Sequence, residues 1–146
     1  MFSLHQLSLD LYTSSRLLIQ LIQVILKEHN LTYPQYLTMR VLWEEDGILV
    51  KEIGERLHLD SGTLTPLIKK LESANYVKRH RGDSDERTVH VELTYPGKSL
   101  QSKVQQALLP LEEQLKEISN LDLADLNHSI QNLLEVFETL KNSSKE

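Results

Sequence analysis

The residues of this 146-residue chain best suited to chemistry gather between positions 61 and 70, where hydroxyl and amine groups alternate with apolar side chains. Hydroxyls and lysine ammonium groups donate hydrogen bonds to phosphate oxygens and to the base edges of duplex DNA. They therefore predict a nucleic-acid contact rather than a catalytic centre. The candidate contacts in this segment are Ser61, Gly62, Thr63, Thr65, Pro66, Lys69 and Lys70.

Two short helices joined by a tight turn would position these side chains. Apolar residues recur every three or four positions in residues 50–57, and the same period restarts after Leu59. Asp60 or Ser61 supplies the side-chain oxygen that caps the second helix. Burying both apolar faces turns the donors outward, while Pro66 should introduce a mild kink near the start of that helix. The apolar positions are Val50, Ile53, Leu57, Leu64, Leu67, Ile68 and Leu71.

A β-hairpin is predicted directly after the second helix. Residues 76–81 and 88–93 are rich in β-forming side chains, and a loop containing Gly, Asp and Ser separates them. Arg87 would enter a narrow minor groove while Asp85 braces it. A surface hairpin with incidental charges is the alternative, but the direct succession of helices and hairpin favours a winged helix-turn-helix. The hairpin candidates for DNA contact are Lys78, Arg79, Arg81, Asp85 and Arg87.

The distribution of charge supports this placement. The whole chain carries a formal net charge of −5. Residues 61–91 hold six Lys and Arg against four Asp and Glu, a net charge of +2, which leaves −7 for the rest. A basic segment in an otherwise acidic protein would orient the chain on DNA.

Catalytic, cofactor and metal sites are not predicted. The sequence contains no cysteine, which excludes a disulfide and a thiolate zinc site. Its six histidines are scattered without metal-ligand spacing, although His80 and His90 would stand near DNA phosphates. The glycines form no phosphate-binding loop, and no serine lies in a nucleophile elbow. We therefore expect a protein that is not an enzyme and that uses no cofactor and no metal.

Long apolar helices are predicted at both ends of the chain. Residues 17–26 are strongly apolar, but Asp10, Arg16, Gln20 and Gln23 argue against a membrane span, and no basic leader or cleavage site is present. We therefore expect a cytoplasmic protein without a membrane partner. Apolar residues also recur every three or four positions in residues 100–118 and 123–140, and Pro110 should bend the first of these helices.

Together these patterns predict a mainly α fold with a small β-hairpin wing (α+β), in which a winged helix-turn-helix is flanked by dimerisation helices. The expected divisions are an N-terminal dimerisation helix in residues 1–30, the DNA-binding part in residues 31–97 and C-terminal dimerisation helices in residues 98–146. A homodimer would cover the excess apolar surface, and its two recognition helices would read an inverted repeat. An intrachain hairpin of the C-terminal helices is the alternative.

Several motifs resemble the MarR family of bacterial regulators and, within it, the organic hydroperoxide regulators. They are D-S-G-T-L-T-P-L-I-K-K-L-E from Asp60, D-E-R-T from Asp85, V-x-L-T-x-x-G from Val91, L-T-Y-P-Q-Y-L from Leu31, L-Y-T-S-S-R from Leu11 and L-W-E from Leu42. The match covers roughly residues 7 to 100 in register. The resemblance implies a homodimeric winged helix-turn-helix repressor whose first helix and last two helices form the dimer interface.

One position departs from the hydroperoxide-sensing pattern. In those regulators a reactive cysteine precedes by four residues the tyrosine that matches Tyr12, and this chain has Ser8 there. Tyr33 matches a second tyrosine that engages the cysteine, whereas Ile22 replaces a third. A hydroxyl does not undergo thiol oxidation chemistry. Ser8 is then either an engineered replacement of a cysteine or the mark of a branch that lost thiol sensing, which the missing tyrosine favours.

A cleft between the N-terminal helix and the DNA-binding part is a candidate pocket for an aromatic or phenolic inducer. The alternative, which we favour, is that these aromatic side chains fill the core. The candidate effector and sensor residues are Ser8, Tyr12, Arg16, Tyr33, Tyr36 and Trp43.

The predicted function is that of a transcriptional regulator, a repressor that binds a pseudo-palindromic operator in double-stranded DNA as a homodimer. A small ligand or an oxidative signal would release the repressor from the operator. The alternative is a winged-helix protein-interaction module without specific DNA binding. The salt dependence of binding distinguishes these two functions, because phosphate binding weakens steeply as the salt concentration rises and binding at an apolar protein interface does not.

Overall fold

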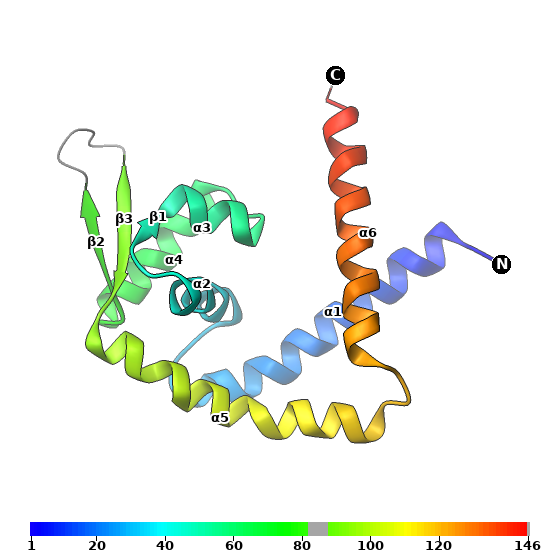
Figure 1. Ribbon diagram of the computed structural model, residues 1–146, viewed down its shortest axis with the longest axis horizontal. Helices are drawn as coiled ribbons and strands as arrows, with labels where there is room; N and C mark the ends of the chain where they lie inside the picture. The colour runs from blue at the N-terminus through cyan, green and yellow to red at the C-terminus, as the bar shows by residue number, and fades with distance from the viewer. Residues whose placement is uncertain (82–87, 146) are drawn as a thin grey trace. The chain divides into compact units, whose positions relative to one another are not determined.

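The computed structural model describes residues 1–81 and 88–145 (Figure 1). It is mainly helical with a small antiparallel sheet, which confirms the predicted fold class. The chain divides into two compact units, residues 1–108 and 109–146. In chain order the elements are α1 (Leu4–Leu26), the 3-10 turn η1 (Lys27–His29), α2 (Tyr33–Glu44), β1 (Ile48–Leu49), α3 (Val50–Leu57), α4 (Ser61–Ser73), β2 (Val77–Arg81), β3 (Val89–Leu93), α5 (Tyr95–Ile118) and α6 (Leu123–Ser143).

The helix-turn-helix consists of α3 and α4, which correspond to the two short helices that the apolar spacing predicts. Of the two candidate caps, Asp60 is the one that the structure shows, because its Oδ1 accepts a hydrogen bond from the Thr63 N–H at 2.7 Å. Gly54 permits the close turn between the helices, since a Cβ there would lie 2.6 Å from the Leu59 carbonyl oxygen. Pro66 lies inside α4, which continues through it to Ser73.

The sheet has three strands in the order β1-β3-β2, all antiparallel. The predicted hairpin is present, with Val77 opposite Leu93 and Arg81 opposite Val89. Sequence reasoning missed β1, because a two-residue strand carries no periodicity. Asp46 links the start of β1 to the end of β3, because its Oδ1 accepts hydrogen bonds from the N–H groups of Gly47 at 2.9 Å and Leu93 at 2.8 Å.

The core of the first unit joins the helix-turn-helix to the sheet and to the first half of α5. A hydrogen bond from Trp43 Nε1 to the Gly97 carbonyl oxygen, 2.9 Å long, ties α2 to the start of α5. Gln23 ties α1 to α2, because its side-chain amide donates to the Leu31 carbonyl and accepts from the Tyr33 N–H. The most deeply buried apolar side chains are Leu26, Met39, Leu42, Ile53, Leu64, Ile68, Leu71, Val77, Val91 and Val104.

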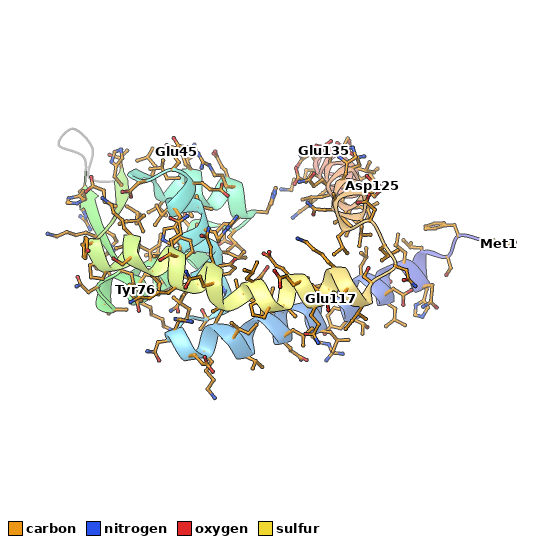
Figure 2. All side chains as sticks on the ribbon, turned by 60° about the horizontal axis from the view of Figure 1, so that its bottom comes forward. Met1, Glu45, Tyr76, Glu117, Asp125 and Glu135 are labelled. Carbon is orange, nitrogen blue, oxygen red and sulfur yellow. The ribbon has the colours of Figure 1, made fainter. Side chains whose placement is uncertain are left out.

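The second unit contains the end of α5 and all of α6, which is capped by the preceding residue Asp122. None of the α6 residues is buried, and side chains project from this helix on all sides (Figure 2). The apolar stripe predicted for residues 123–140, which we call the α6 seam, has no buried member, which gives no support to the intrachain hairpin. The exposed apolar residues of α6 are Leu126, Ile130, Leu134, Val136, Phe137 and Leu140.

The N-terminal helix is also largely exposed. Its only buried residue is Leu26. Among the described residues, one segment, Leu4–His29, is long and apolar enough to cross a membrane by length and composition, with a mean hydropathy of 1.2. A core helix of a soluble protein or a signal sequence has the same composition, so this property alone is weak evidence for a membrane span.

Candidate nucleic-acid interface

All seven DNA-contact candidates of the first sequence segment lie in α4, around the part of the helix that is not buried. Leu64, Ile68 and Leu71 are buried on the opposite face and fix the rotation of the helix about its axis. Thr65 is half-buried, and the others are exposed: Ser61, Gly62, Thr63, Pro66, Lys69 and Lys70. The Thr63 N–H lowers the pKa of the capping Asp60 carboxyl through its hydrogen bond. The helix start is thus held in place, with hydroxyl and ammonium donors facing outward.

The β2–β3 hairpin follows α4 and packs against it (Figure 1). Lys78 and Arg81 are exposed, as a phosphate contact requires. The predicted contacts Asp85 and Arg87 lie outside the described residues, so the minor-groove assignment of Arg87 stays a prediction.

Arg79, also predicted to contact DNA, is engaged by Glu72 of α4. Its Nε and Nη2 donate to Glu72 Oε1 at 3.1 and 3.0 Å, and its backbone N–H donates to Oε2 at 3.0 Å. These bonds lower the pKa of the Glu72 carboxyl, the backbone hydrogen bond most of all. Arg79 therefore joins the hairpin to the recognition helix, a role that sequence reasoning missed.

The Glu72–Arg79 pair should make stability depend on pH. Because the pKa of Glu72 is lowered by folding, its contribution is present above the unfolded value of about 4.3 and is lost as pH falls through the folded value. We expect Glu72→Gln to lower the melting temperature at pH 7 and to reduce the loss of stability below pH 5. Thermal melts between pH 3 and pH 7 measure both, with Glu28→Gln at an exposed position as control. If the melting temperatures of Glu72→Gln and the parent protein fell by the same amount between pH 7 and pH 3, that result would contradict this role of Glu72.

A second pair of side chains, His80 and Glu92, lies on the outer face of the hairpin. His80 lies directly opposite His90, and its Nε2 is 3.2 Å from Glu92 Oε2. Among residues 1–81 and 88–145, no group of three or more His, Asp or Glu side chains is arranged to hold a metal ion.

The six predicted effector residues fall into two groups. On α1, the Ser8 hydroxyl donates to the His5 carbonyl, and the Arg16 guanidinium lies 5.9 Å from the centre of the exposed Tyr12 ring. On α2, Tyr36 contacts Tyr33 at a ring-centre distance of 6.2 Å and Trp43 at 6.4 Å. The α2 rings pack against the core. A pocket shared by both groups stays a prediction.

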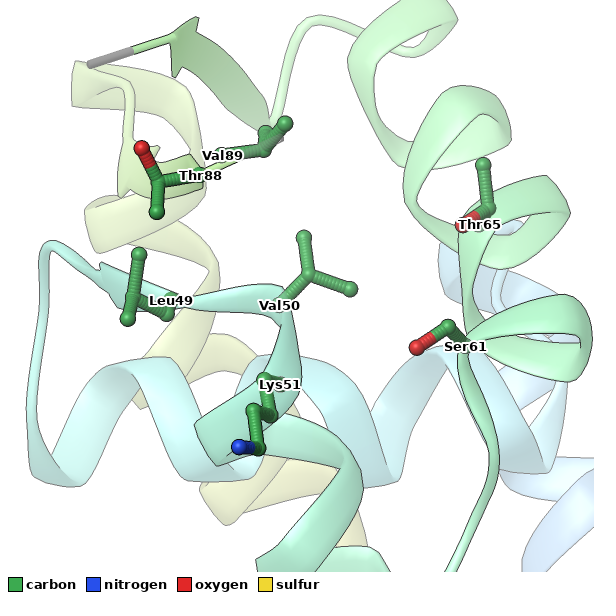
Figure 3. A pocket seen from close by; sticks show the side chains of 7 residues that line it. All are labelled: Leu49, Val50, Lys51, Ser61, Thr65, Thr88 and Val89. Atoms are coloured by element: carbon green, nitrogen blue, oxygen red, sulfur yellow. The ribbon is translucent and has the colours of Figure 1, made fainter. Parts of the chain in front are cut away.

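Sequence reasoning missed an open pocket beside the recognition helix, which we call the α3–α4 pocket. It has a volume of about 250 Å³ and lies between the start of α3, the start of α4 and β3 (Figure 3). Lys51, which is not one of the apolar positions of residues 50–57, is among the residues that line it. The lining residues are Leu49, Val50, Lys51, Ser61, Thr65, Thr88 and Val89.

A helix-turn-helix with an exposed polar recognition face, followed at once by a hairpin, defines a winged-helix DNA-binding regulator. The family described as transcriptional regulator SarA/Rot matches residues 20–107. The chain therefore belongs to the SarA/Rot family of transcriptional regulators.

Individual relatives agree with this assignment. The organic hydroperoxide resistance transcriptional regulator of Bacillus subtilis is 40% identical over 134 residues, covering 90% of this chain and 88% of that protein. The regulator TtmR of Methylorubrum extorquens is 50% identical over 99 residues, 68% of this chain, but the chain spans only 51% of its length. Reduced AbfR bound to DNA has a similar structure, with a TM-score of 0.82 and 34% identity over 93% of each chain. The predicted resemblance to hydroperoxide regulators is thus confirmed.

Proposed function

We propose that this transcriptional regulator is a repressor that binds a pseudo-palindromic operator as a homodimer. The observation that carries the proposal is the outward face of α4, where hydroxyls and lysines stand opposite a buried apolar stripe beside an exposed basic strand. The DNA-bound structure of AbfR supports the same mode of binding. No catalytic residue is required for this function, and we propose that the chain is not an enzyme.

The contacts divide by position. Thr63, Thr65 and Lys69 would enter the major groove, where hydroxyl and ammonium groups read base edges. Lys70, Lys78 and Arg81 would bind phosphates. On the sequence prediction, Arg87 would reach the adjacent minor groove, braced by Asp85.

The homodimer is proposed from apolar surface that one chain leaves exposed. Leu18 and Leu21 of α1 are 44% and 51% exposed, and Phe137 of α6 is 44% exposed. A large exposed apolar surface marks an interface. The exposed apolar side chains of residues 1–30 and 98–146 would form it, leaving residues 31–97 to bind DNA. Asp10 and Arg16 within α1 suit a protein interface better than the interior of a membrane, and we propose a cytoplasmic location.

The releasing signal is proposed to be a small aromatic or phenolic ligand. A chain without cysteine cannot form a sulfenic acid or a disulfide. A ligand near Tyr33 and Tyr36 would alter the fluorescence of Trp43, the single tryptophan, whose ring is 6.4 Å from that of Tyr36. Titration with aromatic acids and quinones tests this, and the absence of a saturable change would count against a ligand at this place.

Operator binding is tested by fluorescence anisotropy with a duplex from upstream of the protein's own gene. We expect binding roughly 1,000-fold tighter than to a shuffled duplex. Affinity should fall by roughly 100-fold or more between 50 and 200 mM salt, because counterions compete for the phosphates. Organic hydroperoxide should leave the affinity unchanged. Equal binding to both duplexes, or binding that is insensitive to salt, would favour the protein-interaction module instead.

A further inference from the structure

The α3–α4 pocket combines an apolar wall with a polar rim. Leu49, Val50 and Val89 supply the wall, and the side chain of Val50 points into the space between β3 and α4 (Figure 3). Lys51, Ser61 and Thr65 supply an ammonium and two hydroxyl groups around it. None of the seven lining residues is acidic, so the pocket suits a ligand with apolar carbons beside a negative charge.

A sugar–phosphate unit of DNA has this composition, because the carbons of a deoxyribose are flanked by anionic phosphates. Two lining residues, Ser61 and Thr65, also belong to the outward face of α4. The pocket is therefore continuous with the surface that would enter the major groove. A backbone strand bordering that groove would pass over it.

We propose that the α3–α4 pocket receives one sugar–phosphate unit of the operator backbone, with Lys51 Nζ pairing with the phosphate. Val50 and Val89 contact the sugar, and the Ser61 hydroxyl donates to an adjacent phosphate oxygen. This inference rests on the proposed function, and it adds residues of α3 and β3 to the DNA contacts. Lys51 is a positioning residue, since a phosphate contact fixes the register of α4 and carries no base sequence information.

The fold gives this contact a fixed geometry. Gly54 lets α3 approach the turn before α4, because its missing Cβ leaves room for the Leu59 carbonyl. Asp60 then holds the first turn of α4 through the Thr63 N–H. Lys51 and the hydroxyls of α4 thus belong to one rigid helix-turn-helix, so a phosphate bound at Lys51 sets how α4 sits in the groove.

The first experiment compares Lys51→Gln with the parent protein and with Lys103→Gln, a matched loss of charge at an exposed position of α5. We expect Lys51→Gln to weaken binding to operator and shuffled duplex alike, by roughly tenfold, and to lower the salt slope by about one. Lys51→Arg should restore most of the affinity, and Lys103→Gln should change little. Melting curves verify that the variants are folded.

The second experiment locates the phosphate. Operator duplexes that carry one neutral methylphosphonate at successive positions are bound to the parent protein and to Lys51→Gln. At one position the methylphosphonate should weaken duplex binding by the parent protein and leave binding by Lys51→Gln unchanged. In addition, the methyl NMR signals of Val50 and Val89 should shift when the parent protein binds the duplex. Specific parent binding with no such position and no methyl shift would overturn this inference alone. Methyl shifts with benzoate but not with DNA would overturn it in favour of a small-molecule site, and failure of the parent to bind any duplex would overturn the proposed function with it.

Discussion

Replacing Gly97 with alanine should destabilise the first unit severely. A Cβ at this position would overlap the carbonyl oxygen of Tyr76 and lie 3.0 Å from its carbonyl carbon. Both neighbours are backbone atoms, which cannot rotate away as a flexible side chain would. The start of α5 would have to move off the turn that joins α4 to β2.

Such a movement would break bonds on both sides of Gly97. The Thr94 N–H donates to the Tyr76 carbonyl at 3.0 Å, and Trp43 Nε1 donates to the Gly97 carbonyl at 2.9 Å. Overpacking costs about 1–3 kcal/mol, and a lost buried hydrogen bond adds about 1 kcal/mol. We expect a loss of about 3 kcal/mol, which corresponds to a fall of roughly 10 °C in melting temperature for a chain of this size.

Thermal and urea unfolding followed by circular dichroism measure the effect. Gly62→Ala is the matched control, because a Cβ there would meet only the Asp60 carboxylate oxygen at 3.3 Å. Alanine adds helix propensity at this position, and the Asp60 side chain must shift by a few tenths of an ångström to make room, so stability should change by less than about 1 kcal/mol. A Gly97→Ala protein that melts within 2 °C of the parent would show that α5 does not approach Tyr76 as closely as the structure indicates.

The recognition segment was predictable because its signals are local. The spacing of Val50, Ile53 and Leu57 fixes one packed helix face, and Asp60 caps the next helix, which begins at Ser61. The hairpin was predictable for a related reason, since β-branched residues and a loop of Gly, Asp and Ser follow at once. Such patterns are readable within a window of about ten residues.

The features that join distant segments were not predictable. Lys51 belongs to a solvated face by helical period, and its place at the α3–α4 pocket depends on β3, about 40 residues later. Trp43 and Gly97 meet across 54 positions. The engagement of Arg79 by Glu72 needs the turn after α4 to bring β2 back along that helix. In each case the partner is chosen by tertiary packing, which a single sequence without an alignment does not reveal.

The aromatic residues show the same limit. Tyr12, Tyr33 and Trp43 share one predicted pocket in the sequence interpretation, yet ring contacts join Tyr33, Tyr36 and Trp43 within α2, and Tyr12 pairs with Arg16 on α1. A helix places residues three, four and seven positions apart on one side. That local rule accounts for the α2 group, and it does not decide whether α1 completes a pocket.

Placing a charge in the α6 seam should separate the proposed dimer and abolish tight operator binding. Ile130 and Phe137 are seven residues apart on one face of α6, 43% and 44% exposed in the single chain. If a second copy covers them, Ile130→Glu together with Phe137→Glu would bury two unpaired carboxylates in each chain. The cost of several kcal/mol per buried charge exceeds what a dimer of moderate affinity can tolerate.

A monomer would hold one half-site instead of two, so the gain from linking two binding events disappears. That gain is about 100-fold to 10,000-fold, and operator affinity should fall by a factor in this range. Analytical ultracentrifugation measures the mass, and anisotropy measures the affinity for full and half operators. Asn132→Glu adds one charge of the same sign on the opposite side of α6, and it should leave both the mass and the affinity unchanged. A double variant that stays dimeric, or that binds the full operator as tightly as the parent, would show that α6 is not the dimer contact. Circular dichroism distinguishes these results from unfolding, because α6 contributes no buried residue to the single chain and its seam can change without disturbing the core.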